Sequence, residues 1–221
     1  MANNRYDLAI FDLDGTLLDT SAGILASVKY TIDKMGFSAL DDKAIARFIG
    51  PPIQESFAAA YGLEGDILQE IATIFRNVYS SEFLLLAQPY DGIFALFDEL
   101  VARGIKPAVA TYKREDYALR LLRHYGFDRY TDILYGGDHE NKLSKKDIIE
   151  KCITTAGITD RSRVVMIGDT KFDAIGAAGM GVDFLGVTWG FGFAAPEDAA
   201  AYPATVGCAD SPSALLPFFV Q

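Results

Sequence analysis

The sequence predicts an α/β fold with a mostly parallel sheet, interrupted after its first strand by a helical insertion. Two observations support this prediction. Short apolar runs bounded by Gly or Asp alternate with segments of helical period, and one long stretch near the amino terminus has helical period alone. Short continuous apolar runs are typical of strands buried on both faces. Strands that alternate with helices along the chain predict a parallel sheet with helices packed on it.

Five apolar runs are expected to form strands. The first covers residues 8–11 and stops at Asp12, and the other four cover residues 105–110, 133–135, 163–167 and 184–187. Apolar residues at helical spacing lie between these runs, for example in segments 93–101 and 148–153. Glycines follow the expected helices and are candidates for their carboxyl-terminal caps, namely Gly104, Gly126, Gly157 and Gly181.

The insertion follows the first strand. From Leu18 to about Gln88 the apolar residues recur at helical spacing, and no run typical of a strand intervenes. We therefore expect residues 18–88 to form a small helical domain, and residues 1–17 and 89–221 to form the α/β core.

Composition excludes several classes of protein. The chain has 221 residues, of which 50% are hydrophobic and 23% are charged, which is typical of a globular protein. A net charge of −10 argues against nucleic acid and anionic membranes as partners. Only two cysteines are present, far apart, and neither a signal peptide nor a run of ~18 apolar residues is recognisable. We therefore expect a cytoplasmic protein.

Polar side chains gather where the expected strands end. Ligands of open α/β sheets bind beyond the carboxyl ends of the strands, so these residues are the candidates for a site. They are Asp12, Asp14, Gly15 and Thr16 after the first run, Thr111, Tyr112 and Lys113 after the second, the lysine-rich segment 138–146 after the third, and Asp169 and Asp173 after the fourth.

These residue types favour phosphate chemistry. Carboxylates placed together repel one another, and a bound divalent cation removes that conflict. Oxygen ligands suit Mg²⁺, which retains water and substrate phosphate as further ligands. A lysine and a hydroxyl beside the cation can share the charge of a phosphate group. With an aspartate as nucleophile, the reaction would be phosphoryl transfer through an aspartyl-phosphate.

Four motifs resemble those of the haloacid dehalogenase superfamily. They are DLDGT from Asp12 to Thr16, Thr111 at a strand end, a lysine before an apolar helix, and GDTKFD from Gly168 to Asp173. The helical insertion, FIGPP at 48–52 and GVTWGFG at 186–192 resemble the phosphoglycolate phosphatase and β-phosphoglucomutase branch. The resemblance implies a Rossmann-like core with a parallel sheet and an all-helical cap inserted after the first strand.

The resemblance also implies roles for individual residues. Asp12 would be the nucleophile, and Asp14 would be the acid for the leaving group and then the base for water. Thr111 would hold phosphate oxygens. The ligands of Mg²⁺ would be Asp12, Asp14, Asp169 and Asp173, with Asp14 contributing its backbone carbonyl.

The catalytic lysine has three candidates, because Lys142, Lys145 and Lys146 all lie in NKLSKKDII. Alignment on the apolar helix favours Lys145, whereas a K-P-x-P pattern would favour Lys142 but both prolines are missing. The residues expected to contact substrate are Gly15, Thr16, Tyr112 and Arg47, although Arg47 could equally be a solvated helix residue. Lys113, Arg114 and Lys146 are expected to be solvated, and Cys152 to lie in the core.

The predicted function is a Mg²⁺-dependent phosphatase acting on a small phosphorylated metabolite: a phosphoglycolate-like compound, a sugar phosphate or a nucleotide. The partner is thus a small molecule rather than nucleic acid or a membrane, and the protein is expected to be a monomer or a homodimer. Two alternatives remain open at this point. A phosphomutase of the β-phosphoglucomutase type would share all four motifs, and a non-catalytic ligand-binding protein could use the same fold.

Overall fold

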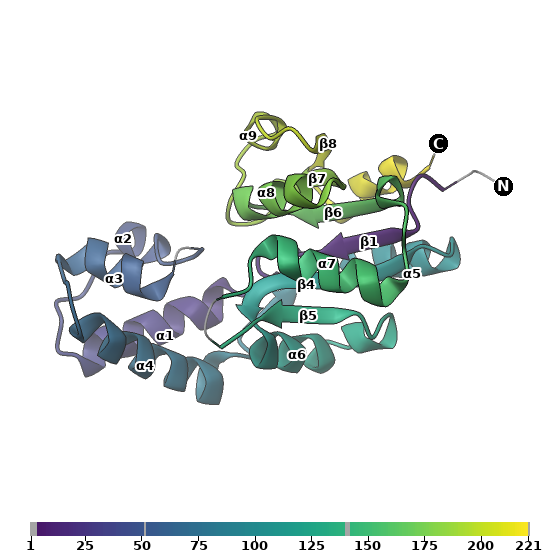
Figure 1. Ribbon diagram of the computed structural model, residues 1–221. Coiled ribbons are helices and arrows are strands. Elements are labelled where there is room, and N and C mark those ends of the chain that lie inside the picture. Colours follow the sequence, from purple (N-terminus) through teal and green to yellow (C-terminus); the bar gives the residue numbers. More distant parts are fainter. Residues whose placement is uncertain (1–3, 51, 140–141, 221) are drawn as a thin grey trace. The chain divides into compact units, whose positions relative to one another are not determined.

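The computed structural model describes residues 4–50, 52–139 and 142–220, and the chain divides into two compact units (Figure 1). The core unit comprises Met1–Asp19 and Pro89–Gln221, and the helical unit comprises Thr20–Gln88. Pro51 of the FIGPP motif and Asn141 of the lysine segment lie outside the described residues. A cap function for the helical unit stays a prediction.

The core unit contains a six-stranded sheet in which every pair of neighbouring strands is parallel. This arrangement confirms the predicted α/β class. The strand order is β5-β4-β1-β6-β7-β8, so β1 lies inside the sheet and all four of its residues are buried. The strands are β1 (Leu8–Phe11), β4 (Lys106–Arg114), β5 (Leu134–Gly137), β6 (Val164–Gly168), β7 (Asp183–Val187) and β8 (Thr205–Ala209).

Register places the polar strand ends at one edge. Phe11, the last residue of β1, pairs with Val109 of β4 and with Ile167 of β6. The backbone N–H of Asp12 continues this ladder and donates to the carbonyl of Ile167 at 2.9 Å. The residues that follow β1 and β6 therefore emerge side by side at the carboxyl edge of the sheet.

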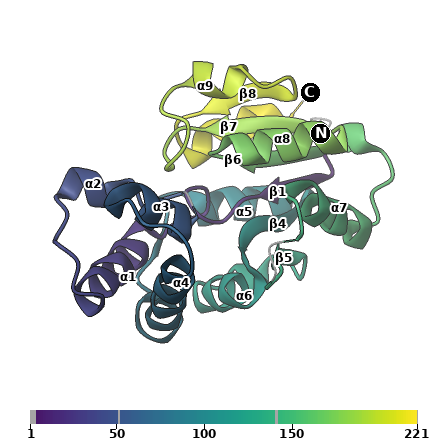
Figure 2. The same ribbon diagram turned by 60° about the vertical axis from the view of Figure 1, so that its left-hand side comes forward.

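Helices cover both faces of this sheet. Helices α7 (Lys145–Ala156) and α8 (Lys171–Met180) cross the near face in Figure 1, and the turned view in Figure 2 shows the same two helices on that face. Their buried residues, among them Cys152, pack on alternate residues of β1, β4 and β6. Helix α5 (Ile93–Ala102) lies on the opposite face, where the rings of Phe11 and Phe97 are 4.9 Å apart. The remaining helical segments are α6 (Glu115–His124), α9 (Pro196–Ala200) and the short 3-10 helices Phe127–Arg129, Arg161–Arg163 and Pro212–Phe219.

The helical unit has a hydrophobic core of its own. It consists of α1 (Ser21–Lys34), α2 (Asp42–Ala46), α3 (Ile53–Tyr61), α4 (Ile67–Val78) and a π-helical turn, Tyr79–Phe83. Phe57 is fully buried, and its ring meets that of Phe48 edge to face at 5.0 Å. The two-residue strands β2 (Leu18–Asp19) and β3 (Gln88–Pro89) pair with each other where the chain passes from one unit to the other.

The six-stranded sheet departs from the expected strands in two main places, and the short strands β2 and β3 were not expected either. Strand β4 does not end before Thr111 but continues to Arg114, with a shift of register between Ala110 and Arg114. Strand β8 was not expected, because its sequence TVGCA is short, contains a glycine and is only partly buried at the sheet edge. Within the part of the chain that the structure describes, no helix combines the length and the apolar character needed to cross a membrane.

Replacing Phe57 by Ala is expected to destabilise the helical unit by about 3–5 kcal/mol, because it removes a fully buried ring and leaves a cavity. Urea unfolding can separate the units, since the only tryptophan, Trp189, lies in the core unit. In Phe57→Ala, the part of the helical circular dichroism that the helical unit contributes should be lost at lower urea than the folded fluorescence of Trp189. Phe184→Ala, which removes a fully buried ring from the core unit, should shift the fluorescence midpoint instead. Equal shifts of both signals in Phe57→Ala would show that the two units unfold as one.

Candidate active site

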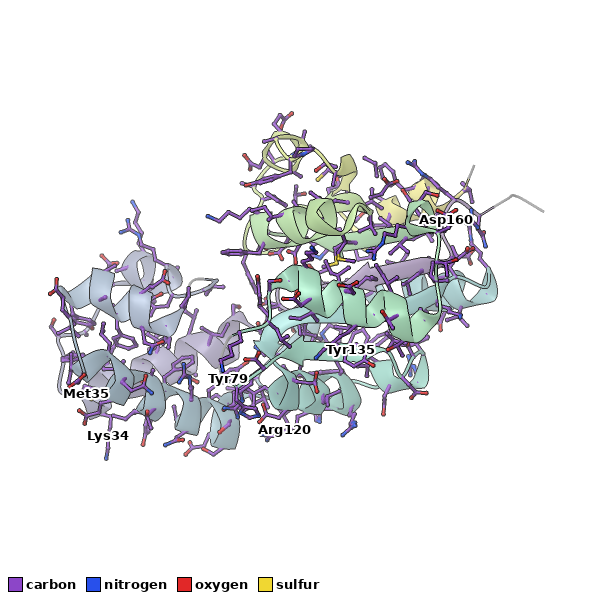
Figure 3. All side chains as sticks on the ribbon, viewed as in Figure 1. Lys34, Met35, Tyr79, Arg120, Tyr135 and Asp160 are labelled. Atoms are coloured by element: carbon purple, nitrogen blue, oxygen red, sulfur yellow. The ribbon has the colours of Figure 1, made fainter. Side chains whose placement is uncertain are left out.

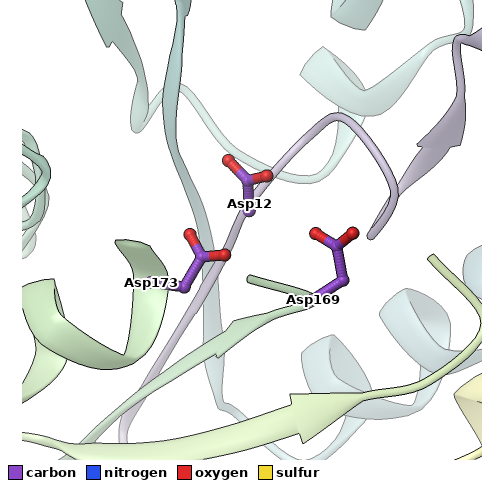
Figure 4. A group of neighbouring side chains, drawn as sticks. All are labelled: Asp12, Asp169 and Asp173. Carbon is purple, nitrogen blue, oxygen red and sulfur yellow. The ribbon is translucent and has the colours of Figure 1, made fainter. Parts of the chain in front are cut away.

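Three buried aspartates converge at the carboxyl edge of the sheet (Figure 4). Asp12 follows β1, Asp169 follows β6, and Asp173 belongs to the first turn of α8. One carboxylate oxygen of each lies within 4.8 Å of those of the other two. Such close packing of acidic groups away from water is costly unless positive charge is nearby.

Lys145 supplies one such charge. It is the first residue of α7, and its side chain is only 3% exposed. Its Nζ lies 2.6 Å from Asp12 Oδ1 and 2.6 Å from Asp173 Oδ1. One buried ammonium thus faces three buried carboxylates. Of the three candidate lysines, Lys145 is the one placed among the aspartates; Lys142 and Lys146 are exposed.

Backbone and hydroxyl donors hold one carboxylate oxygen each of Asp173 and Asp169. The N–H and Oγ1 of Thr170 donate to Asp173 Oδ2 at 3.0 and 2.7 Å, which leaves Asp173 Oδ1 directed at Lys145. Asp169 Oδ2 accepts the backbone N–H groups of Phe191 at 2.7 Å and Gly192 at 3.2 Å. These two amides were not expected to contribute to the site, although they lie in the GVTWGFG segment.

Gly15 and Thr16 close the site on the side of Asp169. Gly15 has a φ of +80°, and a Cβ at this position would overlap the Asp169 carboxylate and the ring of Phe191. Only glycine allows the backbone to approach so closely. Thr16 is fully buried, and its Oγ1 lies 3.4 Å from Asp169 Oδ1. Contact of either residue with a substrate stays a prediction.

The ionisation of the aspartates reflects this crowding. Burial raises the pKa of Asp12, Lys145 opposes that effect, and Asp173 and Asp169 add to it. Burial and the neighbouring Asp173 raise the pKa of Asp169 to about 6. Burial by itself would lower the pKa of Lys145, but Asp12 and Asp173 outweigh it and the pKa is raised. The site favours additional positive charge, and its hard oxygen donors suit a divalent cation.

Asp14 lies apart from this cluster and is paired with Lys113. Lys113 Nζ donates to both oxygens of Asp14, at 2.9 and 3.0 Å, and its side chain is 8% exposed. The expectation that Lys113 is solvated is therefore wrong. The contact depends on the continuation of β4 to Arg114, because side chains alternate along a strand and Lys113 follows Thr111 by two residues.

Thr111 and Tyr112 also belong to this part of β4. Thr111 is 1% exposed, and its Oγ1 accepts the backbone N–H of Lys113 at 3.1 Å. Tyr112 is 45% exposed, and its Oη accepts the backbone N–H of Lys145 at 2.9 Å. The structure therefore places Tyr112 against Lys145, and Thr111 beside Lys113, which pairs with Asp14. Their roles toward a substrate stay predictions.

Arg47 belongs to the helical unit. It is exposed and follows the last residue of α2. Within that unit it lines a hollow of about 420 Å³, together with Leu40, Phe48 and Glu55 among others. A contact between Arg47 and a substrate also stays a prediction.

The chain resembles known proteins both in sequence and in fold. The sequence profile of the family described as haloacid dehalogenase-like hydrolase matches residues 9–187. A solved structure of a hydrolase of the haloacid dehalogenase-like family from Streptococcus pneumoniae is similar in fold, with a TM-score of 0.86 and 31% identity. The similarity covers 97% of this chain and 98% of that one.

Curated relatives include several enzymes of phosphate chemistry. The chain is 33% identical to a 5'-nucleotidase of Pseudomonas aeruginosa, over 93% of this chain and 92% of that protein. It is 32% identical to a phosphoglycolate phosphatase of Agrobacterium fabrum, over 83% of this chain and 81% of that protein. It is also 34% identical to the tyrosine-protein kinase PtkA of Mycobacterium tuberculosis, over 84% of this chain but only 63% of that protein.

Asp169→Asn is expected to change how stability depends on pH in protein stripped of metal by EDTA. Because the pKa of Asp169 is raised to about 6, the folded state binds the proton more tightly than the unfolded state. This contribution to stability is complete below about pH 4 and is lost as the pH rises through about 6. The variant cannot ionise at this position, so its free energy of unfolding relative to the wild type should rise between about pH 4.5 and pH 7.5. Urea unfolding in EDTA measures the free energy of unfolding of both proteins at each pH. If the difference between them stayed constant with pH, it would contradict the raised pKa of Asp169.

Proposed function

The chain belongs to the haloacid dehalogenase-like hydrolase family, and we propose that it is a Mg²⁺-dependent phosphatase that hydrolyses a small phosphorylated metabolite through an aspartyl-phosphate. It is a phosphoric monoester hydrolase, in agreement with its similarity to a 5'-nucleotidase and a phosphoglycolate phosphatase. The observation that carries the finer proposal is the buried Lys145 between Asp12 and Asp173, with Asp169 beside them.

Asp12 is the nucleophile in this proposal. Lys145 holds its Oδ1 at 2.6 Å, which fixes the rotation of the carboxylate, and we assign the attack to the other oxygen, Oδ2. The bond from Oδ2 to phosphorus forms while the bond from phosphorus to the leaving oxygen breaks. The ammonium of Lys145 also stabilises negative charge that develops on the phosphoryl oxygens. Thr111 adds a hydroxyl at the same edge of the sheet.

Asp14 is the general acid and then the general base in this proposal. Two hydrogen bonds from Lys113 fix the orientation of this carboxylate in the resting protein. After taking up a proton from solvent, the carboxyl group gives that proton to the leaving oxygen. The carboxylate left behind then takes a proton from the water that hydrolyses the aspartyl-phosphate, which restores the protonated form for the next cycle. Because Lys145 contacts Asp12 and Lys113 contacts Asp14, each of the two reacting carboxylates has a lysine of its own.

The proposed metal site comprises Asp12, Asp169, the backbone carbonyl of Asp14, and Asp173 in support. When bound there, Mg²⁺ would neutralise the charge shared by the carboxylates and the substrate phosphate. Asp169 is prepared for this task, because the N–H groups of Phe191 and Gly192 hold one of its oxygens in place.

The substrate class follows from chemistry rather than from a defined pocket. Gly15, Thr16 and Tyr112 are proposed to border the phosphate and its leaving group, and Arg47 to contact the far end of the substrate. We keep the range of substrates at phosphoglycolate-like compounds, sugar phosphates and nucleotides. We also propose a cytoplasmic monomer or homodimer that binds neither nucleic acid nor membranes.

Phosphate release from a panel of these substrates should require Asp12. We expect Asp12→Asn to lower kcat/KM by roughly 10⁴-fold or more, because the nucleophile is lost. Asp7→Asn is the matched control, since Asp7 precedes the same strand at its amino end and pairs with Arg163 instead. Full activity of Asp12→Asn would contradict the mechanism. Absence of phosphate release by the folded wild type would contradict the phosphatase proposal, and isomerisation of a sugar phosphate with its bisphosphate activator would then identify a mutase.

Mg²⁺ should stabilise the protein through Asp169. At a concentration 100-fold above its dissociation constant, a ligand adds about 2.7 kcal/mol of stability. For a chain of this size the Tm should rise by roughly 5–10 °C over that in EDTA. Asp169→Asn should abolish most of this rise. Asp160→Asn should not, because Asp160 precedes the amino end of β6 (Figure 3), whereas Asp169 follows its carboxyl end. A wild-type Tm that does not respond to Mg²⁺ would contradict the proposed site.

A further inference from the structure

We propose that Tyr112 is a positioning residue for Lys145, acting through its hydroxyl on the first amide of α7. The inference rests on the proposed function, because it concerns the lysine that holds the nucleophile. Tyr112 belongs to β4 and Lys145 begins α7, so the contact joins a strand to a helix 33 residues later in the chain.

The hydroxyl of Tyr112 takes up a helix amide that has no partner within its helix. The first four N–H groups of an α-helix lack acceptors inside that helix. Ser144 precedes α7 and accepts the N–H of Asp147 through its side chain. The N–H of Lys145 donates instead to Tyr112 Oη, at 2.9 Å. The position of the first turn of α7 is therefore fixed relative to β4.

The ring of Tyr112 borders the charged end of the same lysine. Lys145 Nζ lies 5.7 Å from the ring centroid, within the range of a cation–π interaction. Tyr112 thus contacts Lys145 at both ends, at its backbone amide and at its ammonium. A long, flexible side chain gains a defined position in this way.

A second ring connects Tyr112 to the helix that carries Asp173. Phe172 lies in the first turn of α8, directly before Asp173, and its ring stands edge-on to that of Tyr112 at 5.8 Å. The Tyr112–Phe172 pair therefore links the first turns of α7 and α8. These turns supply the ammonium and one of the carboxylates that it contacts, at 2.6 Å.

Small displacements at this place have large effects on catalysis. A shift of about 1 Å in a positioned group can lower the rate by about 10²-fold. The ammonium of Lys145 contacts both Asp12 and Asp173 at 2.6 Å, so movement of the start of α7 would lengthen two ion pairs together. The hydroxyl of Tyr112 opposes such movement.

Tyr112→Phe tests the inference, because it removes the hydroxyl and keeps the ring. Tyr135→Phe is the matched control. Tyr135 (labelled in Figure 3) lies on β5, and its hydroxyl is 2.8 Å from Thr155 Oγ1 at the other end of α7. Its ring also borders a lysine, with Lys151 Nζ 5.9 Å from the centroid. The control thus also removes a tyrosine hydroxyl that contacts α7, but at the end of the helix away from the aspartates.

We expect Tyr112→Phe to lower kcat by about 5-fold, the effect of losing one hydrogen bond. The loss should be the same for p-nitrophenyl phosphate and for the best metabolite, with KM unchanged, because Lys145 acts on the phosphoryl group that all substrates share. The Tm should fall by no more than about 2–4 °C, the effect of one lost hydrogen bond on a chain of this size. Exchange of the Lys145 amide with deuterium, followed by NMR, should accelerate by about as much. Tyr135→Phe should leave kcat and this exchange rate unchanged.

Three outcomes would overturn the inference. They are a wild-type kcat in Tyr112→Phe, an unchanged exchange rate of the Lys145 amide, and a loss that appears in KM for one substrate only. The last result would show that the hydroxyl of Tyr112 acts directly on a leaving group, beside which it is proposed to lie, and not through Lys145. Absence of phosphate release by the wild type would contradict the proposed function instead, and the exchange measurement would still decide whether Tyr112 holds the start of α7.

Discussion

The site depends on an imbalance of buried charge. Asp12, Asp169 and Asp173 lie within reach of one another at the edge of the sheet, and among the described residues Lys145 is the buried lysine that contacts them. Backbone amides and a hydroxyl hold one carboxylate oxygen of Asp173 and one of Asp169. The carboxylates carry more negative charge than Lys145 neutralises, and a bound divalent cation would neutralise the rest. The same cation would also attract the phosphate group of the proposed substrate.

Parallel strand topology makes this concentration of charge possible. Strand β1 pairs with β4 and with β6, so the chain leaves each of these strands at the same edge. Helices α7 and α8 begin at that edge, and their first turns carry Lys145 and Asp173. Acidic residues are favoured in the first turn of a helix because of its dipole, and Asp173 occupies that turn of α8. The buried sheet provides the rigid support that positioned catalytic groups require.

The extension of β4 adds a second set of contacts. Because the strand continues to Arg114, successive side chains alternate in direction, and Lys113 reaches Asp14 while Tyr112 reaches the start of α7. One short segment thereby contacts both the carboxylate proposed for proton transfer and the lysine proposed to hold the nucleophile. A single strand thereby positions residues proposed for proton transfer and for nucleophilic attack.

The sequence by itself determined the α/β class, the parallel sheet and the motif aspartates, because buried strands and strand-end carboxylates are local patterns that the chain displays directly. Alignment on the apolar helix also favoured Lys145, the lysine that the structure places beside Asp12. Only the tertiary structure decided that Lys113 is paired with Asp14 and that Tyr112 binds the amide of Lys145. These contacts join residues 99 and 33 positions apart, and they depend on where β4 ends and how its side chains alternate. A run that loses its apolar character at Thr111 does not reveal that the strand continues, because pairing with β5 and the site, rather than hydrophobicity, extend it.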